Sequence, residues 1–261
     1  MIKFSSRFIL LLSLILFYSG CGSAMLSDEY LARHSKAQFS RMKDKDSVSS
    51  DSNYREMIQR IGERIAGVAQ VDLPGTEWEF VVFEKPEPNA FAMPGGKVGV
   101  NSGLIKLANE NEDEIAAVIG HEIAHVAFRH SNKRMSQAMG IALGGVILDT
   151  AMRKKSSSER VLAGGAYGIG TSVGMALPFS RKQEKEADHR GLYYSAMAGY
   201  DPRGAISFWK KMQNEKKRKM PEFLSTHPNP GNRIEFLQSN MDRAFALYVN
   251  AKKARGEKPN L

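Results

Sequence analysis

Residues 113–125 read DEIAAVIGHEIAH, and this stretch governs the interpretation of the rest of the chain. Its alanine and apolar spacers favour a helix, which we predict over residues 111–130. Side chains four positions apart project from the same face of a helix, so His121 and His125 can hold one metal ion. Glu122 lies one position further round, where its carboxylate can reach a water on that ion without binding the ion itself.

The spacers of this helix would also bury its polar residues. Ile115, Ala116, Val118 and Ile119 would place two histidines and a glutamate in a core, where such groups need polar partners. Zinc bound there would lower the pKa of a water towards about 7 and polarise a carbonyl, and Glu122 could pass the water's proton to a leaving amine. Because the five-residue pattern also occurs by chance on ordinary helices, a third ligand has to be found.

A third ligand is available in residues 180–188, SRKQEKEAD, which we predict to lie on a helix over residues 181–198. Glu184 and Asp188 share one face of that helix, whereas Glu186 points roughly the opposite way. Glu184 would complete a His, His, Glu site with a fourth position open to water. Asp188 would lie behind it and accept the free N–H of a ligand histidine. The alternative is an ordinary charged helix surface.

Four motifs together resemble a single peptidase family. They are the HEIAH pentapeptide, residues 180–188, THP at residues 226–228 followed by Arg233, and residues 89–104, NAFAMPGGKVGVNSGL. In this combination the chain is similar to the HtpX, Oma and CAAX-prenyl-protease family of gluzincin metallopeptidases over about residues 53–240. It most resembles the exported, lipid-anchored members of the LoiP and YcaL type.

The resemblance implies one Zn²⁺ per subunit, held by His121, His125 and Glu184, with Glu122 as general base and Asp188 behind the ligands. The fold class expected is α+β and mainly helical. It would be a zincin-like metallopeptidase domain with a small β-sheet and an active-site helix that carries the histidine motif.

The role of His227 stays open. A histidine before a proline is commonly a loop residue with a local hydrogen bond. In the family context it lies near the cleft, where it could stabilise the tetrahedral oxyanion or occupy the open metal position in a resting state. Arg233 is a further candidate for the oxyanion or for bracing its helix. His130, five residues after His125, is predicted to lie off the metal-facing side.

Three extended segments, residues 78–83, 89–92 and 97–101, predict a small sheet ahead of the metal helix. The middle segment consists of Asn89, Ala90, Phe91 and Ala92. It could offer a strand edge on which an unfolded peptide pairs through its backbone, which tolerates many side chains. The alternative is an ordinary inner strand.

The first residues predict export. Lys3 and Arg7 precede an apolar run over residues 8–18, which is too short to span a bilayer and suits a signal peptide. The run leads into YSGC, which resembles a bacterial lipobox, so residues 1–20 would be removed and Cys21 would be lipidated. A plain cleaved signal with an incidental thiol is the alternative.

The mature chain is expected to have two parts. Residues 21–52, rich in Ser, Lys and Asp, predict a flexible tether, and residues 53–255 predict the metallopeptidase domain. Within it, the Gly- and Ala-rich residues 138–177 predict a helical hairpin packed on the domain or dipping into a membrane surface. Its first helix, residues 138–148, is too short to span a bilayer.

The expected function is that of a zinc endopeptidase that degrades unfolded or misassembled envelope proteins without ATP. The N-terminal pattern places it on the periplasmic face of a bacterial membrane, and Gly22 after the cysteine favours the outer membrane. The net charge of +9 comes without a nucleic-acid motif, so no nucleic-acid partner is expected. The alternatives are a chaperone or binding lipoprotein that keeps the fold, a zinc hydrolase of a non-peptide bond, and a structural lipoprotein.

Overall fold

The structure is a computed structural model of the 261-residue chain, and it describes residues 26–165, 179–216, 222–227 and 232–260. The chain divides into two compact units. The larger one consists of Asp28–Ser131 and Pro178–Leu261, and the smaller one of Met1–Ser27 and Asn132–Leu177.

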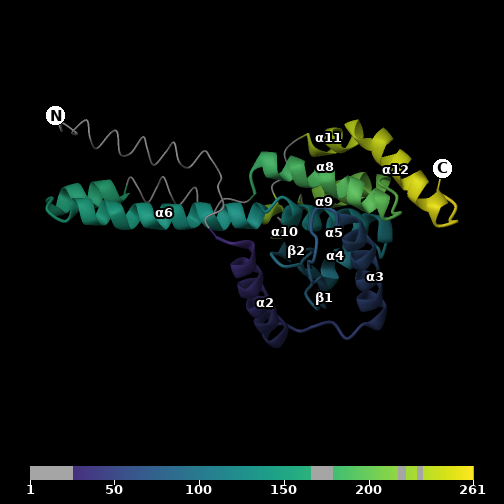
Figure 1. The fold of residues 1–261 in the computed structure, drawn as a ribbon, viewed down its shortest axis with the longest axis horizontal. Coiled ribbons are helices and arrows are strands. Elements are labelled where there is room, and N and C mark those ends of the chain that lie inside the picture. Colours follow the sequence, from purple (N-terminus) through teal and green to yellow (C-terminus); the bar gives the residue numbers. More distant parts are fainter. Residues whose placement is uncertain (1–25, 166–178, 217–221, 228–231, 261) are drawn as a thin grey trace. The chain divides into compact units, whose positions relative to one another are not determined.

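The helix with the histidine motif, α5 (Glu112–Ala127), forms the centre of the larger unit. It packs against α3 (Ser52–Ala69), α8 (Arg181–Met197) and α9 (Arg203–Lys216) (Figure 1). Asn111 caps α5, since its side chain accepts hydrogen bonds from the first backbone N–H groups of the helix. The spacers predicted to face a core are buried, and Ile115 and Ile119 have no exposed surface.

Four further helices of this unit are α4 (Ser102–Leu107), α10 (Glu222–Thr226), α11 (Arg233–Ser239) and α12 (Met241–Ala254). Helices α11 and α12 pack on α8, and α11 also contacts α9. The prediction of a mainly helical α+β fold is confirmed.

The predicted small sheet is present and mixed. Its strands are β1 (Glu79–Phe83), β2 (Ala90–Met93) and β3 (Lys97–Asn101), in the order β1-β3-β2. Strand β3 pairs parallel with β1 and antiparallel with β2, and β2 also packs against α5. Strand β2 is therefore an edge strand beside the metal helix, and not an inner strand, within the part of the chain that the structure describes.

The prediction of a flexible tether is wrong for residues 28–45, which form helix α2 (Asp28–Lys45). Its buried residues Leu31, Ser35 and Phe39 recur every four positions and give it one inward face. The Phe39 ring lies 6.0 Å from that of Phe83, edge to face, and α2 contacts β3. Two large apolar side chains are enough to dock this helix, although the composition around them is polar.

Most of the smaller unit that the structure describes is α6 (His130–Met152). A turn follows, and residues 157–165 are helical again, while the remaining residues of the predicted hairpin, 166–177, lie outside the described ranges. The first helix is longer than predicted: it has 23 residues, and by length and composition it could cross a membrane.

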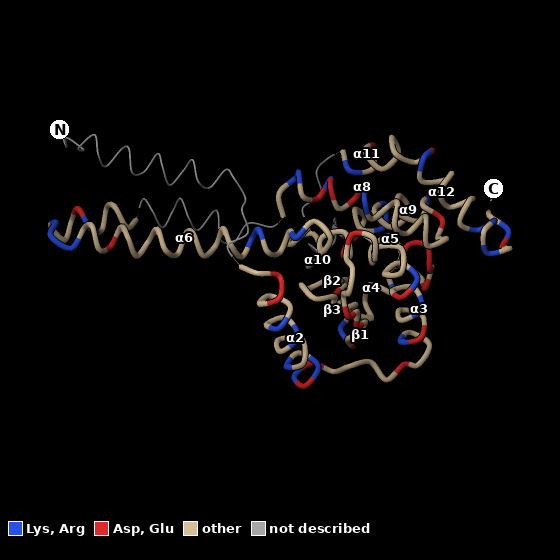
Figure 2. The backbone as a smooth tube through the Cα atoms, in the orientation of Figure 1, with Lys and Arg blue, Asp and Glu red and all other residues tan. Residues whose placement is uncertain are grey.

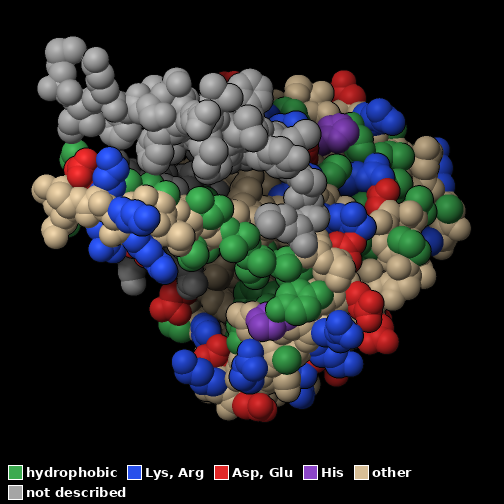
Figure 3. Space-filling view, turned by 60° about the vertical axis from the view of Figure 1, so that its left-hand side comes forward, with side chains coloured by type: hydrophobic (Ala, Val, Ile, Leu, Met, Phe, Trp, Pro, Cys, Tyr) green, Lys and Arg blue, Asp and Glu red, His purple; other side chains and the backbone are tan. Residues whose placement is uncertain are grey.

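Helix α6 is apolar, and few of its side chains are buried. Residues 135–148 contain no Lys, Arg, Asp or Glu, and basic residues follow the end of the helix (Figure 2). Only 11% of its most apolar stretch is buried, and Leu143, Val146 and Ile147 are at least half exposed. Figure 3 shows hydrophobic side chains gathered among basic ones on one face of the molecule.

Candidate metal centre

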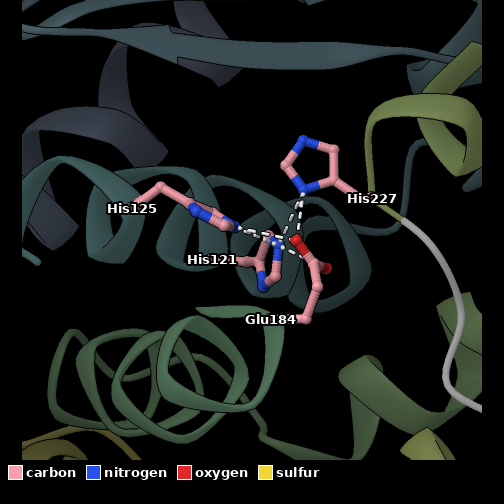
Figure 4. Close-up of side chains that lie close together, drawn as sticks. All are labelled: His121, His125, Glu184 and His227. Carbon is pink, nitrogen blue, oxygen red and sulfur yellow. Dashed lines mark hydrogen bonds and ion pairs between the residues drawn. The ribbon is translucent and has the colours of Figure 1, made fainter. Parts of the chain in front are cut away.

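Four buried side chains converge in the larger unit (Figure 4). His121 and His125 extend from α5, Glu184 from the first turn of α8, and His227 directly follows α10. The Nε2 atoms of His121 and His125 lie 3.0 Å apart. Oε1 of Glu184 lies 3.4 Å from His125 Nε2 and 3.1 Å from His227 Nδ1. The structure thus brings the three predicted ligands together and adds His227 to them.

This cluster is suited to a metal ion by its donor atoms. One ligand atom from each of the four residues lies within 4.8 Å of the others, and no residue of the four is more than 4% exposed. Imidazole nitrogens and a carboxylate oxygen are the usual protein ligands of catalytic divalent metals. The lone pairs that converge here, shielded from water, would be satisfied by a cation between them.

The convergence depends on a close crossing of α5 and α8. A Cβ atom on Gly191 would lie 2.6 Å from the backbone nitrogen of His121, and one on Gly120 would lie 2.6 Å from the carbonyl oxygen of Gly191. Ser180 and Gln183 start α8 with a capping box, each side chain bonded to the other's backbone N–H. The two glycines and this cap place Glu184 directly over the histidines.

Glu122 lies between the cluster and the sheet. Its Oε2 accepts a hydrogen bond of 3.1 Å from the Ala92 backbone N–H on β2, and its Oε1 lies 3.4 Å from His227 Nε2. Burial raises the pKa of this carboxyl to about 7, although the nearby His227 opposes the rise. Glu122 therefore stands next to the ligand atoms without being one of the four, as the sequence predicts for a general base.

Asp188 lies behind His121, where the sequence predicts a supporting carboxylate. Its Oδ1 is 2.9 Å from His121 Nδ1, the ring nitrogen that faces away from the other ligands. Burial raises the pKa of Asp188 to about 7, and the charge of Arg233 works against that rise. As an acceptor, Asp188 would keep the His121 proton on Nδ1 and leave Nε2 free for a metal.

Arg233 joins the two acids of α8 and also lies beside His121, with its Nη2 3.1 Å from His121 Nδ1 and 3.3 Å from His121 Nε2. Its guanidinium donates to Glu184 Oε2 at 2.9 Å and also to Asp188. Burial alone would raise the pKa of Glu184, but hydrogen bonds from His125 and His227 and the charge of Arg233 hold it well below its usual value. Of the two predicted roles of Arg233, this position fits bracing.

The sequence as a whole matches a known family. The model of peptidase family M48 matches residues 52–241, which include α5, the sheet, α8 and the His227 segment. The chain belongs to peptidase family M48. This confirms the family resemblance seen in the motifs and makes the four-residue cluster the candidate metal centre of an M48 metallopeptidase.

The relatives of this M48 chain include bacterial proteins and mitochondrial proteins of eukaryotes. It is 33% identical over 189 residues to the mitochondrial metalloendopeptidase OMA1 of Schizosaccharomyces pombe. The aligned residues are 72% of this chain and 53% of that protein. It is 31% identical over 190 residues to the beta-barrel assembly-enhancing protease of Yersinia pestis (69% and 37%). The Escherichia coli protein of that name is 29% identical over 213 residues (78% and 42%). The chain thus spans about half or less of the length of these relatives.

Two residues at the M48 centre were missed from the sequence. His130 is fully buried, and its Nδ1 lies 2.9 Å from His125 Nδ1, while its Nε2 lies 3.1 Å from Glu186 Oε2. As predicted, His130 is not among the four clustered residues, but it lies directly behind His125 because α5 does not continue to residue 130. It ends at Ala127, and Arg129 adopts a φ of 55° that interrupts the helical spacing. Helical spacing carries no signal for such a turn.

The structure describes the predicted substrate segment but not the predicted lipid anchor. Asn89 is 9% exposed and precedes β2, and Ala90, Phe91 and Ala92 form most of that edge strand. The Phe91 ring packs against those of Phe83 and Phe39, and the Ala92 N–H of β2 donates to Glu122. Cys21 and the signal residues 1–20 lie outside the described residues.

Proposed function

We propose that this M48 protein is a zinc-dependent endopeptidase of the bacterial envelope. The observation that carries the proposal is the position of Glu122, a buried carboxylate between a His, His, Glu, His cluster and the backbone of an edge strand. A peptide bond held along that strand would lie beside both the ligand atoms and a base.

The residues divide the work of hydrolysis. Zinc, when bound by His121, His125 and Glu184, supplies a Lewis acid that lowers the pKa of its water to about 7 and polarises the scissile carbonyl. Glu122 takes the proton of the attacking water and delivers it to the leaving amine. Its raised pKa suits both steps, because a carboxyl that titrates near 7 accepts and releases a proton at little cost.

His227 can serve at two stages. Its Nδ1 lies 3.3 Å from His121 Nε2, among the ligand atoms, while its Nε2 faces Glu122. In the resting protein it can therefore fill the fourth ligand position, and with substrate bound it can donate a hydrogen bond to the oxyanion.

Substrate would bind by adding a strand to β2. Backbone pairing at a sheet edge supplies hydrogen bonds that do not depend on sequence, so unfolded segments of many proteins could be accepted. We propose unfolded or misassembled membrane and periplasmic proteins as substrates, cleaved without ATP. The similarity to a protein named beta-barrel assembly-enhancing protease supports this class.

The location rests on the N-terminal sequence. A basic start, an apolar run and YSGC support lipidation at Cys21 and a tether to the periplasmic face of the outer membrane. The protein should incorporate labelled palmitate in cells, and Cys21→Ala should not. Equal labelling of the Cys21→Ala protein would contradict lipidation at this residue, and this readout does not depend on whether the apolar α6 also binds the membrane.

The decisive experiment compares native protein with Glu122→Gln on unfolded casein, with and without a chelator. Cleavage should require zinc and should fall at least about 100-fold in Glu122→Gln, since general acid–base catalysis contributes that much. Glu56→Gln, the same change on the exposed side of α3, is the matched control and should cleave like the native protein. Unchanged cleavage in Glu122→Gln would overturn the proposal, and suppression of aggregation without cleavage by the native protein would favour a chaperone.

A further inference from the structure

His125 has a polar partner on the side away from the metal cluster, as His121 does, but of another kind. His121 Nδ1 meets Asp188 directly at 2.9 Å. His125 Nδ1 instead meets a second imidazole, that of His130, at 2.9 Å, and this ring meets Glu186 at 3.1 Å. The three residues form a continuous chain of hydrogen bonds from a candidate ligand towards the protein surface.

The nitrogen with which His125 binds the metal decides which group donates and which accepts in each of these hydrogen bonds. His125 presents Nε2 to Glu184 and His121, so a neutral His125 that binds through Nε2 carries its proton on Nδ1. That N–H donates to His130 Nδ1, which must then be the unprotonated nitrogen. The proton of His130 consequently sits on Nε2 and is donated to the Glu186 carboxylate. With this assignment, each of the two hydrogen bonds has one donor and one acceptor.

The surrounding structure holds the ring of His130 in place. The positive φ of Arg129 interrupts the helix after α5, and His130, the first residue of α6, lies directly behind His125. The ring stacks on that of Phe128, with centroids 5.5 Å apart and planes at 16°. The side chain of Glu186 is 33% exposed, so the chain of hydrogen bonds has a carboxylate at its outer end that water can reach.

We propose that His130 is a positioning residue for the metal site, which holds His125 in the Nδ1–H form with its Nε2 directed at the metal, and that Glu186 anchors His130. The inference rests on the proposed zinc site. It assigns to α8 three acids with three tasks: Glu184 as ligand, Asp188 behind His121, and Glu186 behind His125 through His130.

The test measures zinc affinity by competition with a chromogenic chelator. His130→Phe keeps a ring of similar size but offers no acceptor, and it should weaken zinc binding by about 10–100-fold, as loss of a partner behind a ligand histidine does. His130→Asn places an amide oxygen near the position of Nδ1 and should restore most of the affinity, whereas the longer His130→Gln should not. Glu186→Gln should weaken binding less than His130→Phe, because a neutral amide oxygen still accepts a hydrogen bond from the His130 Nε2–H.

His34→Phe is the matched control, since His34 is exposed on α2, and it should bind zinc like the native protein. Thermal unfolding of the zinc-free variants separates positioning from folding, because positioning changes zinc affinity at an unchanged zinc-free unfolding temperature. If His130→Phe does not fold, the pair His130→Asn and His130→Gln carries the comparison.

Two failures are distinguishable. A native protein that binds no zinc overturns the proposed function itself. A native protein that binds zinc, beside a His130→Phe or a His130→Gln protein that binds it equally tightly, overturns only the role of His130.

Discussion

Arg233 has a fully buried guanidinium that binds two carboxylates. Glu184 and Asp188 stand four residues apart on α8, and in a buried site they would repel one another without a cation between them. The guanidinium also lies over the indole ring of Trp209, 3.6 Å from its centroid, which fixes its plane. A single side chain from α11 therefore holds both acids in place and keeps Glu184 charged.

Replacing Arg233 with Met should destabilise the zinc-free protein by about 3–5 kcal/mol, because it leaves buried carboxylates without their partner. Zinc should recover part of this loss, since it supplies another positive charge to Glu184. Urea unfolding with and without zinc measures both effects. Arg33→Met, at an arginine side chain that is 72% exposed, should change stability by no more than about 0.5 kcal/mol, and an equal loss in the two variants would contradict the argument.

The protonation of His125 is a second property of single residues. Burial lowers the pKa of His125 to about 3, although Glu184 opposes the shift. A histidine with a lowered pKa is neutral at every pH above that value, so His125 should stay neutral in the zinc-free protein at about pH 5, where an ordinary histidine is charged. Nitrogen-15 NMR of the imidazole should show the neutral form with the proton on Nδ1. A titration midpoint near 6.5 would contradict this prediction.

The crossing of α5 and α8 is the element-level feature on which the site depends. Gly120 and Gly191 allow the two helix backbones to touch, and the contact sets the height of Glu184 above the histidines. A side chain at either position would push the helices apart, although alanine is otherwise the better helix former.

Gly191→Ala should therefore destabilise the protein by about 1–3 kcal/mol and weaken zinc binding, because its Cβ would meet the His121 backbone. Gly67→Ala is the matched control: it also lies in a helix, α3, but a Cβ there meets no atom within 4 Å. It should be neutral or stabilise by up to about 1 kcal/mol. Denaturant unfolding and zinc titration of the two variants check the contrast, and equal behaviour would refute it.

Sequence periodicity predicts the relative positions of residues well where those residues lie on the same helix or strand. The four-residue spacing placed His121 beside His125 and Glu184 beside Asp188, and the strand over residues 97–101 has the bounds predicted for it. His130 could not be found in this way, because a positive φ at Arg129 ends the helical spacing. Helix α2 was missed because two apolar residues, Leu31 and Phe39, lie among many polar ones.

At the scale of the whole molecule, the metal centre joins distant parts of the chain. His121 and His227 are separated by 106 residues, and their elements meet only in the folded protein. The order of the strands likewise could not be predicted from the sequence, because the parallel pairing of β1 with β3 joins segments that are not consecutive and has no local sequence pattern.

Zinc should therefore stabilise the whole larger unit. An ion present at about 1,000 times its dissociation constant adds about 4 kcal/mol, and each kcal/mol raises the unfolding temperature of a domain of this size by about 2–4 °C. Thermal unfolding should show a rise of roughly 8–16 °C over the chelated protein. His125→Ala should lose most of this rise, and an equal rise in that variant would show that zinc acts elsewhere.

The place of Arg233 in the chain has a consequence for biosynthesis. A growing chain that has been made through α9 already contains His121, His125 and Glu184, but the cation that holds Glu184 and Asp188 is still missing. The candidate metal centre is therefore expected to be among the last parts of the chain to form. Chains truncated before residue 233 should bind zinc more weakly than the full chain, and equal binding would refute this order of assembly.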